Sequence, residues 1–282
     1  MEGDVGALGV LASLSLVAIA ALISARLGLG LELAIGGAAV RALAQLLLVG
    51  AALGIVIGQD QPLVWSWLWV AGILIIASWV VWRRAPELPG VFWLALAANV
   101  VTAAVAAGLV FGLGVFPLEG RTLIPVMGMT IGNALTATVV AATLLVREVG
   151  ERRDDVEARL ALGRPWQDAV RPHLRAVLRA AISPQIERTR HLGTVFLPGA
   201  MVGLILAGVD PLDAVLVQGA LMYVILGSVA TSTAVIALGA AHRLFTRDHR
   251  LLPLARATGP PPEERLARRA LALLRRGGER AG

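Results

Sequence analysis

The sequence predicts an all-α, polytopic helical membrane protein with about seven transmembrane helices. Hydrophobic residues make up 57% of the 282 residues and charged residues only 16%, whereas soluble domains have about 45–50% and about 25%. The mean hydropathy is +0.77. Several uninterrupted apolar runs also reach about 20 residues, the length that crosses a bilayer. The chain is therefore too apolar and too poor in charge to be a soluble globule.

Seven apolar segments are the candidate membrane spans. They cover residues 6–25, 33–57, 63–82, 91–116, 122–146, 192–209 and 214–240. The first follows an acidic N-terminus and is long for a signal peptide, so we interpret it as a helix of the mature protein. We assign residues 1–250 to one transmembrane domain with a cytoplasmic loop at 147–193, and residues 251–282 to an arginine-rich tail. Within the tail, the pattern of residues 263–276 is typical of a solvated or membrane-surface helix rather than of a specific partner site.

The arginines indicate the orientation of the spans. Outside the apolar segments, 23 of the 25 basic residues follow the odd-numbered spans, and only Arg121 lies on the opposite side. Cytoplasmic loops carry an excess of arginine and lysine. We therefore expect the N-terminus outside and the C-terminus in the cytoplasm of a cell that carries this protein in its inner (plasma) membrane. The same rule accounts for the net charge of +6 without a nucleic-acid partner.

Missing residue types exclude several kinds of chemistry. The chain has no cysteine, which excludes disulfides, thiolate nucleophiles and cysteine-type zinc sites. Every one of the 25 basic residues is arginine, so the lysine of a nucleotide-binding P-loop is absent. No Asp, Glu or His lies deep in a span, and a membrane enzyme would need such a cluster. We therefore expect a protein that is not an enzyme and carries no cofactor of its own; its metal ligands, if any, are unknown.

Polar residues inside the spans are the candidates for a transport pathway. Arg41 and Gln45 lie four residues apart in the second span and so share one helix face. An ionisable residue at membrane depth costs at least a few kcal/mol and indicates function. Arg41 could equally extend to the cytoplasmic interface, and both interpretations stay open. The remaining predicted pathway residues are Asn99, Thr130, Asn133 and Gln218.

Two spans carry residues that weaken a helix. Pro125, Gly128 and Gly132 lie in the fifth span, and Pro198 and Gly199 in the short sixth span. Helix breaks at membrane depth are tolerated where they line a cavity, so these positions are candidate gating residues. Gly128 and Gly132 also form a GxxxG pair, which favours close helix packing. The two interpretations are compatible.

The cytoplasmic loop has the pattern of a helix, a glycine turn and a second helix. Glu157 and Ala158 are followed by Gly163, where a positive φ would close the turn, and then by Arg164 and Trp166. We expect Glu157 near the start of the short helix, where the helix dipole favours an acid. Apolar residues at positions 166, 170, 174, 177 and 181 form a stripe on the second helix. An amphipathic cytoplasmic surface of this kind indicates docking to a partner.

This loop resembles the EAA loop of ABC-transporter permeases. The blocks at residues 41–50, 124–134, 197–203 and 206–214, with Gln218 following, are similar to those of FetB-like ABC permeases, described as iron-export permeases with plant relatives linked to aluminium tolerance. The resemblance covers about residues 35–250. Val217 departs from it, because the family pattern has an aromatic residue before Gln218.

The resemblance implies a permease subunit that acts as a homodimer and exports iron or a metal complex. A separate ABC ATPase would bind ATP and Mg²⁺, and the segment from Glu157 to Trp166 would be the coupling element in a cleft of that ATPase. Two alternatives remain open. One is ABC export of a small organic solute. The other is a membrane scaffold without transport activity that recruits a cytoplasmic partner.

Overall fold

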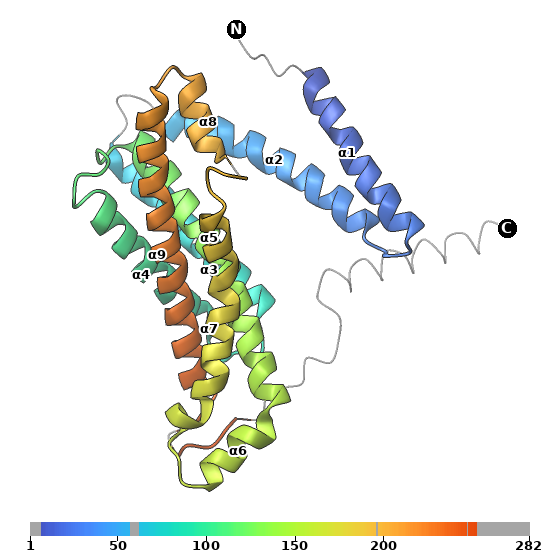
Figure 1. Cartoon of the computed structure of the whole chain (residues 1–282), viewed down its shortest axis with the longest axis vertical. Helices are drawn as coiled ribbons and strands as arrows, with labels where there is room; N and C mark the ends of the chain where they lie inside the picture. Colours follow the sequence, from blue (N-terminus) through green and yellow to red (C-terminus); the bar gives the residue numbers. More distant parts are fainter. Residues whose placement is uncertain (1–6, 57–61, 196, 247, 253–282) are drawn as a thin grey trace, which may run out of the picture. The chain divides into compact units, whose positions relative to one another are not determined.

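The computed structural model describes residues 7–56, 62–195, 197–246 and 248–252. These residues form nine α-helices, which belong to two compact units (Figure 1). Of the described residues, 7–56 belong to one unit and those from 62 onward to the other. The amphipathic helix expected at 263–276 lies outside the described residues.

The first unit contains a hairpin of two apolar helices, α1 (Ala7–Arg26) and α2 (Glu32–Val56). Ser24 ties the turn together: its hydroxyl donates to Glu32 at 2.9 Å and accepts from the Leu31 N–H at 3.0 Å. Most described side chains of α2 are exposed within the chain, as expected for a helix that meets lipid or another helix.

The second unit is a bundle built around α5 (Gly120–Glu151) and α9 (Pro211–Arg243). The other helices of this unit are α3 (Leu63–Arg84), α4 (Val91–Val110), α6 (Arg153–Ala161), α7 (Trp166–Arg190) and α8 (Gly199–Leu206). Small buried residues, including Ala141 on α5 and Ala237 on α9, let the helices approach closely. Such van der Waals packing drives helix association in lipid. A buried hydrogen bond of 2.6 Å joins Thr138 to Ser232 across the two central helices.

The structure confirms a polytopic helical membrane protein. Among the described residues, five helices are long and apolar enough to cross a bilayer, at 32–54, 63–84, 91–110, 120–151 and 211–243, and a shorter apolar helix covers 12–26. These helices overlap the first five and the seventh predicted segments, with limits that differ by up to six residues. Trp65, Trp79 and Trp93 are exposed on α3 and α4, as expected for faces that contact lipid.

The prediction of one spanning helix at 192–209 is wrong. Helix α8 covers only Gly199–Leu206, and the chain before it is a turn in which Gly193 has φ of +77°. Hydropathy averages composition over a segment, so it does not register such an interruption. Helix α7, which lies within the loop expected to be cytoplasmic, runs back along α5 and α9 (Figure 1).

The expected interruption of the fifth span is absent from the structure. Helix α5 continues through Pro125, Gly128 and Gly132. Proline removes one helical N–H, and here it does so near the helix start, where Leu123 and Met127 are fully buried and hold the chain in place. A Cβ added at either glycine would meet nothing within 4 Å, so neither glycine makes a close helix contact within the described chain.

Candidate functional site

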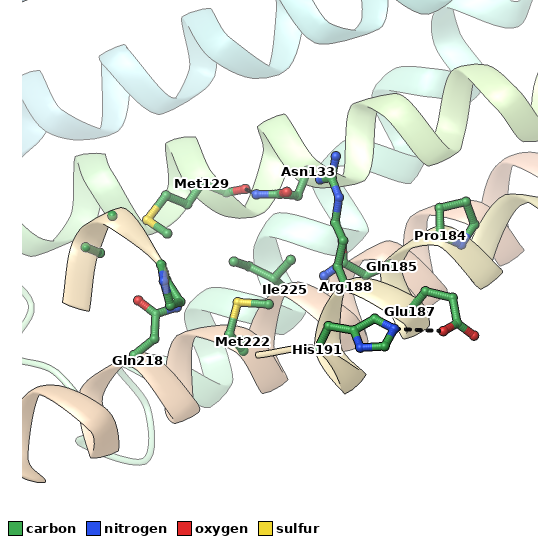
Figure 2. A pocket seen from close by; sticks show the side chains of 13 residues that line it. Met129, Asn133, Pro184, Gln185, Glu187, Arg188, His191, Gln218, Met222 and Ile225 are labelled. Atoms are coloured by element: carbon green, nitrogen blue, oxygen red, sulfur yellow. Dashed lines mark hydrogen bonds and ion pairs between the residues drawn. The ribbon is translucent and has the colours of Figure 1, made fainter. Parts of the chain in front are cut away.

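A cavity of about 660 Å³ lies among α5, α7, α8 and α9. Met129 and Asn133 of α5 form one wall, and α7 supplies a second wall near its C-terminal end. Figure 2 shows these side chains together with Gln218 and Met222 of α9. The cavity therefore combines residues that are almost 100 positions apart in the sequence.

Three carboxamides line this cavity. Asn133 is half-buried, and its Nδ2 donates to the Met129 carbonyl at 2.8 Å. Gln185 and Gln218 are 7% and 5% exposed. The Oε1 of Gln218 is buried and has no hydrogen-bond partner among the described residues. An unsatisfied buried polar atom costs about 1–3 kcal/mol, so Gln218 is a polar group that a bound molecule could satisfy.

The charged residues of the cavity differ in their pairing. Glu187 forms ion pairs with Arg190 at 2.9 Å and with His191 at 3.8 Å. Arg188 forms no ion pair with any residue that the structure describes. In Figure 2 the Arg188 side chain extends from α7 toward Asn133, whereas Glu187 turns to His191. The unpaired charge on the cavity wall is therefore positive.

The sequence-predicted pathway residues divide into three groups. The cavity brings together Asn133, Gln218, Pro198 and Gly199. Asn99 and Thr130 are each 1% exposed in the packed interior and do not line it. Asn99 donates from Nδ2 to the Ser78 hydroxyl at 3.0 Å, and its Oδ1 has no partner in the described part of the chain.

Arg41 and Gln45 form the third group. Both lie on α2 of the other unit, and both are exposed. Their expected place on the pathway therefore stays a prediction.

Sequence reasoning missed the contribution of α7 to the cavity. Gln185 and Arg188 were assigned to a cytoplasmic loop, yet both line the cavity. The apolar stripe of α7, which we expected to dock to a partner, carried the signal, because Val170, Leu174, Val177 and Ala181 are buried within the chain itself. Gln185 and Arg188 follow Ala181 by four and seven residues and so lie on the same helix face.

The second candidate site is the turn between α6 and α7. Gly163 has φ of +79°, which confirms the positive φ expected there. Its N–H donates to the Leu160 carbonyl at 2.9 Å, and the Arg164 N–H donates to the Arg159 carbonyl at 3.2 Å. These two bonds form a Schellman motif, which ends α6 sharply. Ala158, Leu162 and Arg164 are exposed around the turn.

Glu157 does not lie at the start of α6, contrary to the prediction. The helix begins at Arg153, and its first-turn acids are Asp154 and Asp155. Glu157 accepts a hydrogen bond from the Arg153 guanidinium at 2.7 Å. The sequence pattern missed this boundary because the helix starts directly after α5, with only Arg152 between the two. Glu157 is thus an exposed, ion-paired residue of the α6 surface.

Buried contacts hold this turn against the bundle. His173 of α7 is 7% exposed, and its ring nitrogens lie 3.1 Å from Glu148 of α5 and 3.1 Å from Asp155 of α6. Trp166 stacks on Phe245 with ring centroids 5.4 Å apart. Three helices and the end of α9 are thereby fixed to one another.

Asp155 also has an altered pKa. The hydrogen bond from Arg159 lowers the pKa of this carboxyl below its ordinary value of 3.8, and the bond to His173 acts in the same direction. Asp155 therefore stays ionised at neutral pH and retains both contacts.

The chain matches known proteins over most of its length. The family described as "Uncharacterised protein family (UPF0014)" matches residues 7–245. The UPF0014 membrane protein YjkA of Bacillus subtilis is 32% identical over 74% of this chain and 83% of its own length. The UPF0014 membrane protein STAR2 of Oryza sativa is 35% identical over 76% of this chain and 75% of its own length.

A third relative is named the probable iron export permease protein FetB, from Escherichia coli. It is 29% identical over 85% of this chain and 92% of its own length. No solved structure matches the chain. Because the family match covers far more than half of the residues, and the helices are those of a multi-pass membrane protein, this chain is a membrane protein of the UPF0014 family.

Proposed function

We propose that this chain is the membrane-spanning subunit of an ABC transporter that exports iron, as a metal ion or a metal complex. ATP would be bound with Mg²⁺ and hydrolysed by a separate ATPase subunit. The relative named as a probable iron export permease supports the cargo, and the absence of any lysine in the sequence supports a separate site of ATP hydrolysis.

Helix α7 is the observation that carries this proposal. Its first residue, Trp166, follows the Gly163 turn, and its last turns supply Gln185 and Arg188 to the cavity. The helix has 25 residues, which corresponds to roughly 37 Å at 1.5 Å per residue. A partner that moves the turn would therefore move the cavity wall through one continuous element.

The contacts of His173 near the Gly163 turn would transmit a movement of the turn to the neighbouring helices. His173 connects α7 to both α5 and α6, so the turn cannot shift without its neighbours. On the outside, the Gly163 turn presents an exposed surface that includes Leu162, which is 79% exposed. We assign the segment from Glu157 to Trp166 as the coupling element that docks in a cleft of the ATPase.

The assembly in this proposal is a homodimer in the inner (plasma) membrane, with the C-terminus in the cytoplasm. Permeases of this kind need two membrane halves around one pathway, and a single chain supplies one half. The exposed apolar surface of α2, together with Arg41 and Gln45, would face the pathway at the dimer axis. This placement predicts that Arg41 contributes to transport rather than to anchoring at the interface.

Reconstitution with the partner ATPase tests the function. ATP hydrolysis is measured in proteoliposomes against a panel of metal ions, metal complexes and organic solutes. Stimulation by iron species is the expected result. Stimulation by organic solutes alone would favour export of a small organic solute, and stable docking without stimulation by any cargo would favour the scaffold.

A further inference from the structure

We infer that the cavity among α5, α7, α8 and α9 binds its cargo as an oxygen-rich anion that also carries a hydroxyl, so that a metal would be carried as an anionic complex and not as a bare cation. This inference rests on the proposed transport function and specifies the chemical class of the cargo. Three features of the cavity carry it: an unpaired guanidinium, the start of a helix and a buried carboxamide without a partner.

Arg188 supplies the positive charge. It lines the cavity and forms no ion pair among the described residues. Its neighbour Glu187 is engaged by Arg190 and His191 and turns away from the guanidinium in Figure 2. Guanidinium groups bind carboxylates and phosphates through two parallel hydrogen bonds. An arginine left without a protein partner on a cavity wall is suited to such a ligand.

The start of α8 lies at the same cavity. Pro198 is the N-cap residue and makes no side-chain capping hydrogen bond, while Gly199 and Ala200 line the cavity. The first N–H groups of an α-helix have no partner within the helix, and the helix dipole adds a partial positive charge there. Together these groups favour an anion. Pro198 and Gly199 have no polar side-chain atom that could compete for the N–H groups.

Gln218 is the independent sign that a ligand belongs here. The side chain is 5% exposed, lines the cavity, and has an Oε1 atom without a partner in the described chain. Figure 2 shows Gln218 and Arg188 on different walls of one cavity. Oε1 only accepts hydrogen bonds, so it would bind a hydroxyl of the ligand, while Arg188 and the start of α8 bind the anionic oxygens of the same molecule.

The cavity is poorly equipped for a bare cation. Hard cations require several oxygen ligands, usually with carboxylates among them. Glu187 is the one carboxylate among the described lining residues, and Arg190 and His191 already engage it. Met129 and Met222 offer thioethers, but these suit soft metals, and Arg188 would repel any bare metal ion.

Equilibrium dialysis of the purified full chain tests the inference without ATP and without the ATPase. The probes are citrate, ferric citrate and Fe²⁺ alone. The variants are Arg188→Gln, which removes the cavity charge, and Arg179→Gln, which makes the same change of net charge on α7 away from the cavity. Gel filtration of each variant confirms that it is folded.

Wild type and Arg179→Gln should bind citrate or ferric citrate, and Arg188→Gln should bind them about 10- to 100-fold more weakly, as expected for loss of a charge-assisted hydrogen bond. Equal binding by Arg188→Gln, binding of Fe²⁺ alone, or no binding of either anion would overturn the inference. The dialysis contains no ATPase, so its result does not depend on the proposed ABC partnership. Failure of the ATPase to dock in a separate pull-down would contradict the proposed function, and the dialysis would still test the cargo class.

Discussion

Substitution of Gly163 by valine is the sharpest test of the coupling element. The glycine has φ of +79° and lies in a turn closed by two backbone hydrogen bonds. A Cβ added at this position would meet nothing within 4 Å. Valine would therefore create no steric clash with the rest of the chain, and its whole effect would come from the backbone conformation.

The expected magnitude follows from this geometry. A left-handed conformation costs an L-residue roughly 1–2 kcal/mol, and a β-branched residue adopts it least readily. A cost of that size lowers the population of the native turn about 5- to 30-fold relative to competing conformations. Asparagine tolerates the left-handed region, so Gly163→Asn adds a side chain at the same position with little backbone strain.

The assay compares wild type, Gly163→Val and Gly163→Asn in pull-down titrations with the partner ATPase and in cargo-stimulated hydrolysis. We expect Gly163→Val to bind more weakly, by up to about 5- to 30-fold, since docking requires the native turn. Gly163→Asn should stay close to wild type. Gel filtration should show that both variants are intact, because Gly163 packs against nothing. Equal docking and equal stimulation in all three proteins would refute the assignment of this turn as the coupling element.

Further predictions concern other parts of the chain. Arg41→Ala should reduce transport in proteoliposomes while membrane insertion and ATPase binding stay intact; normal transport would instead show that Arg41 only anchors the helix at the interface. Trp166→Ala should destabilise the protein by about 1–3 kcal/mol through loss of its ring packing, seen as a lower Tm, and an unchanged Tm would contradict that role. Because the pKa of Asp155 is lowered, its stabilising contribution is complete above pH 3.8 and is lost as pH falls through the lowered pKa; ATPase docking should therefore lose nothing through this group between pH 5 and 8, which titrated pull-downs measure. A reporter fused after residue 282 should be cytoplasmic and one placed near residue 119 external, and protease protection would reveal the reverse.

The sequence by itself determined most of the helices and one of the turns. Apolar runs of spanning length are a local property, so the limits of α3 and α9 lie within a few residues of the predicted segments. The Gly163 turn is local as well, because a short helix followed by glycine needs only a positive φ to end. The apolar stripe of α7 also marked four residues that are buried, although we expected this surface to dock to a partner.

Only the tertiary structure decided what α7 packs against. Its arginines indicated a cytoplasmic loop, since hydropathy and charge counts describe a segment without its neighbours. In the folded chain the stripe lies against α5 and α9, which carries Gln185 and Arg188 to Asn133 and Gln218. The cavity is lined by residues of four helices, and the periodicity of any one segment does not predict which helices pack together. The pairing of charges, which leaves Arg188 without a partner among the described residues, likewise depends on rotamers and contacts that only the fold fixes.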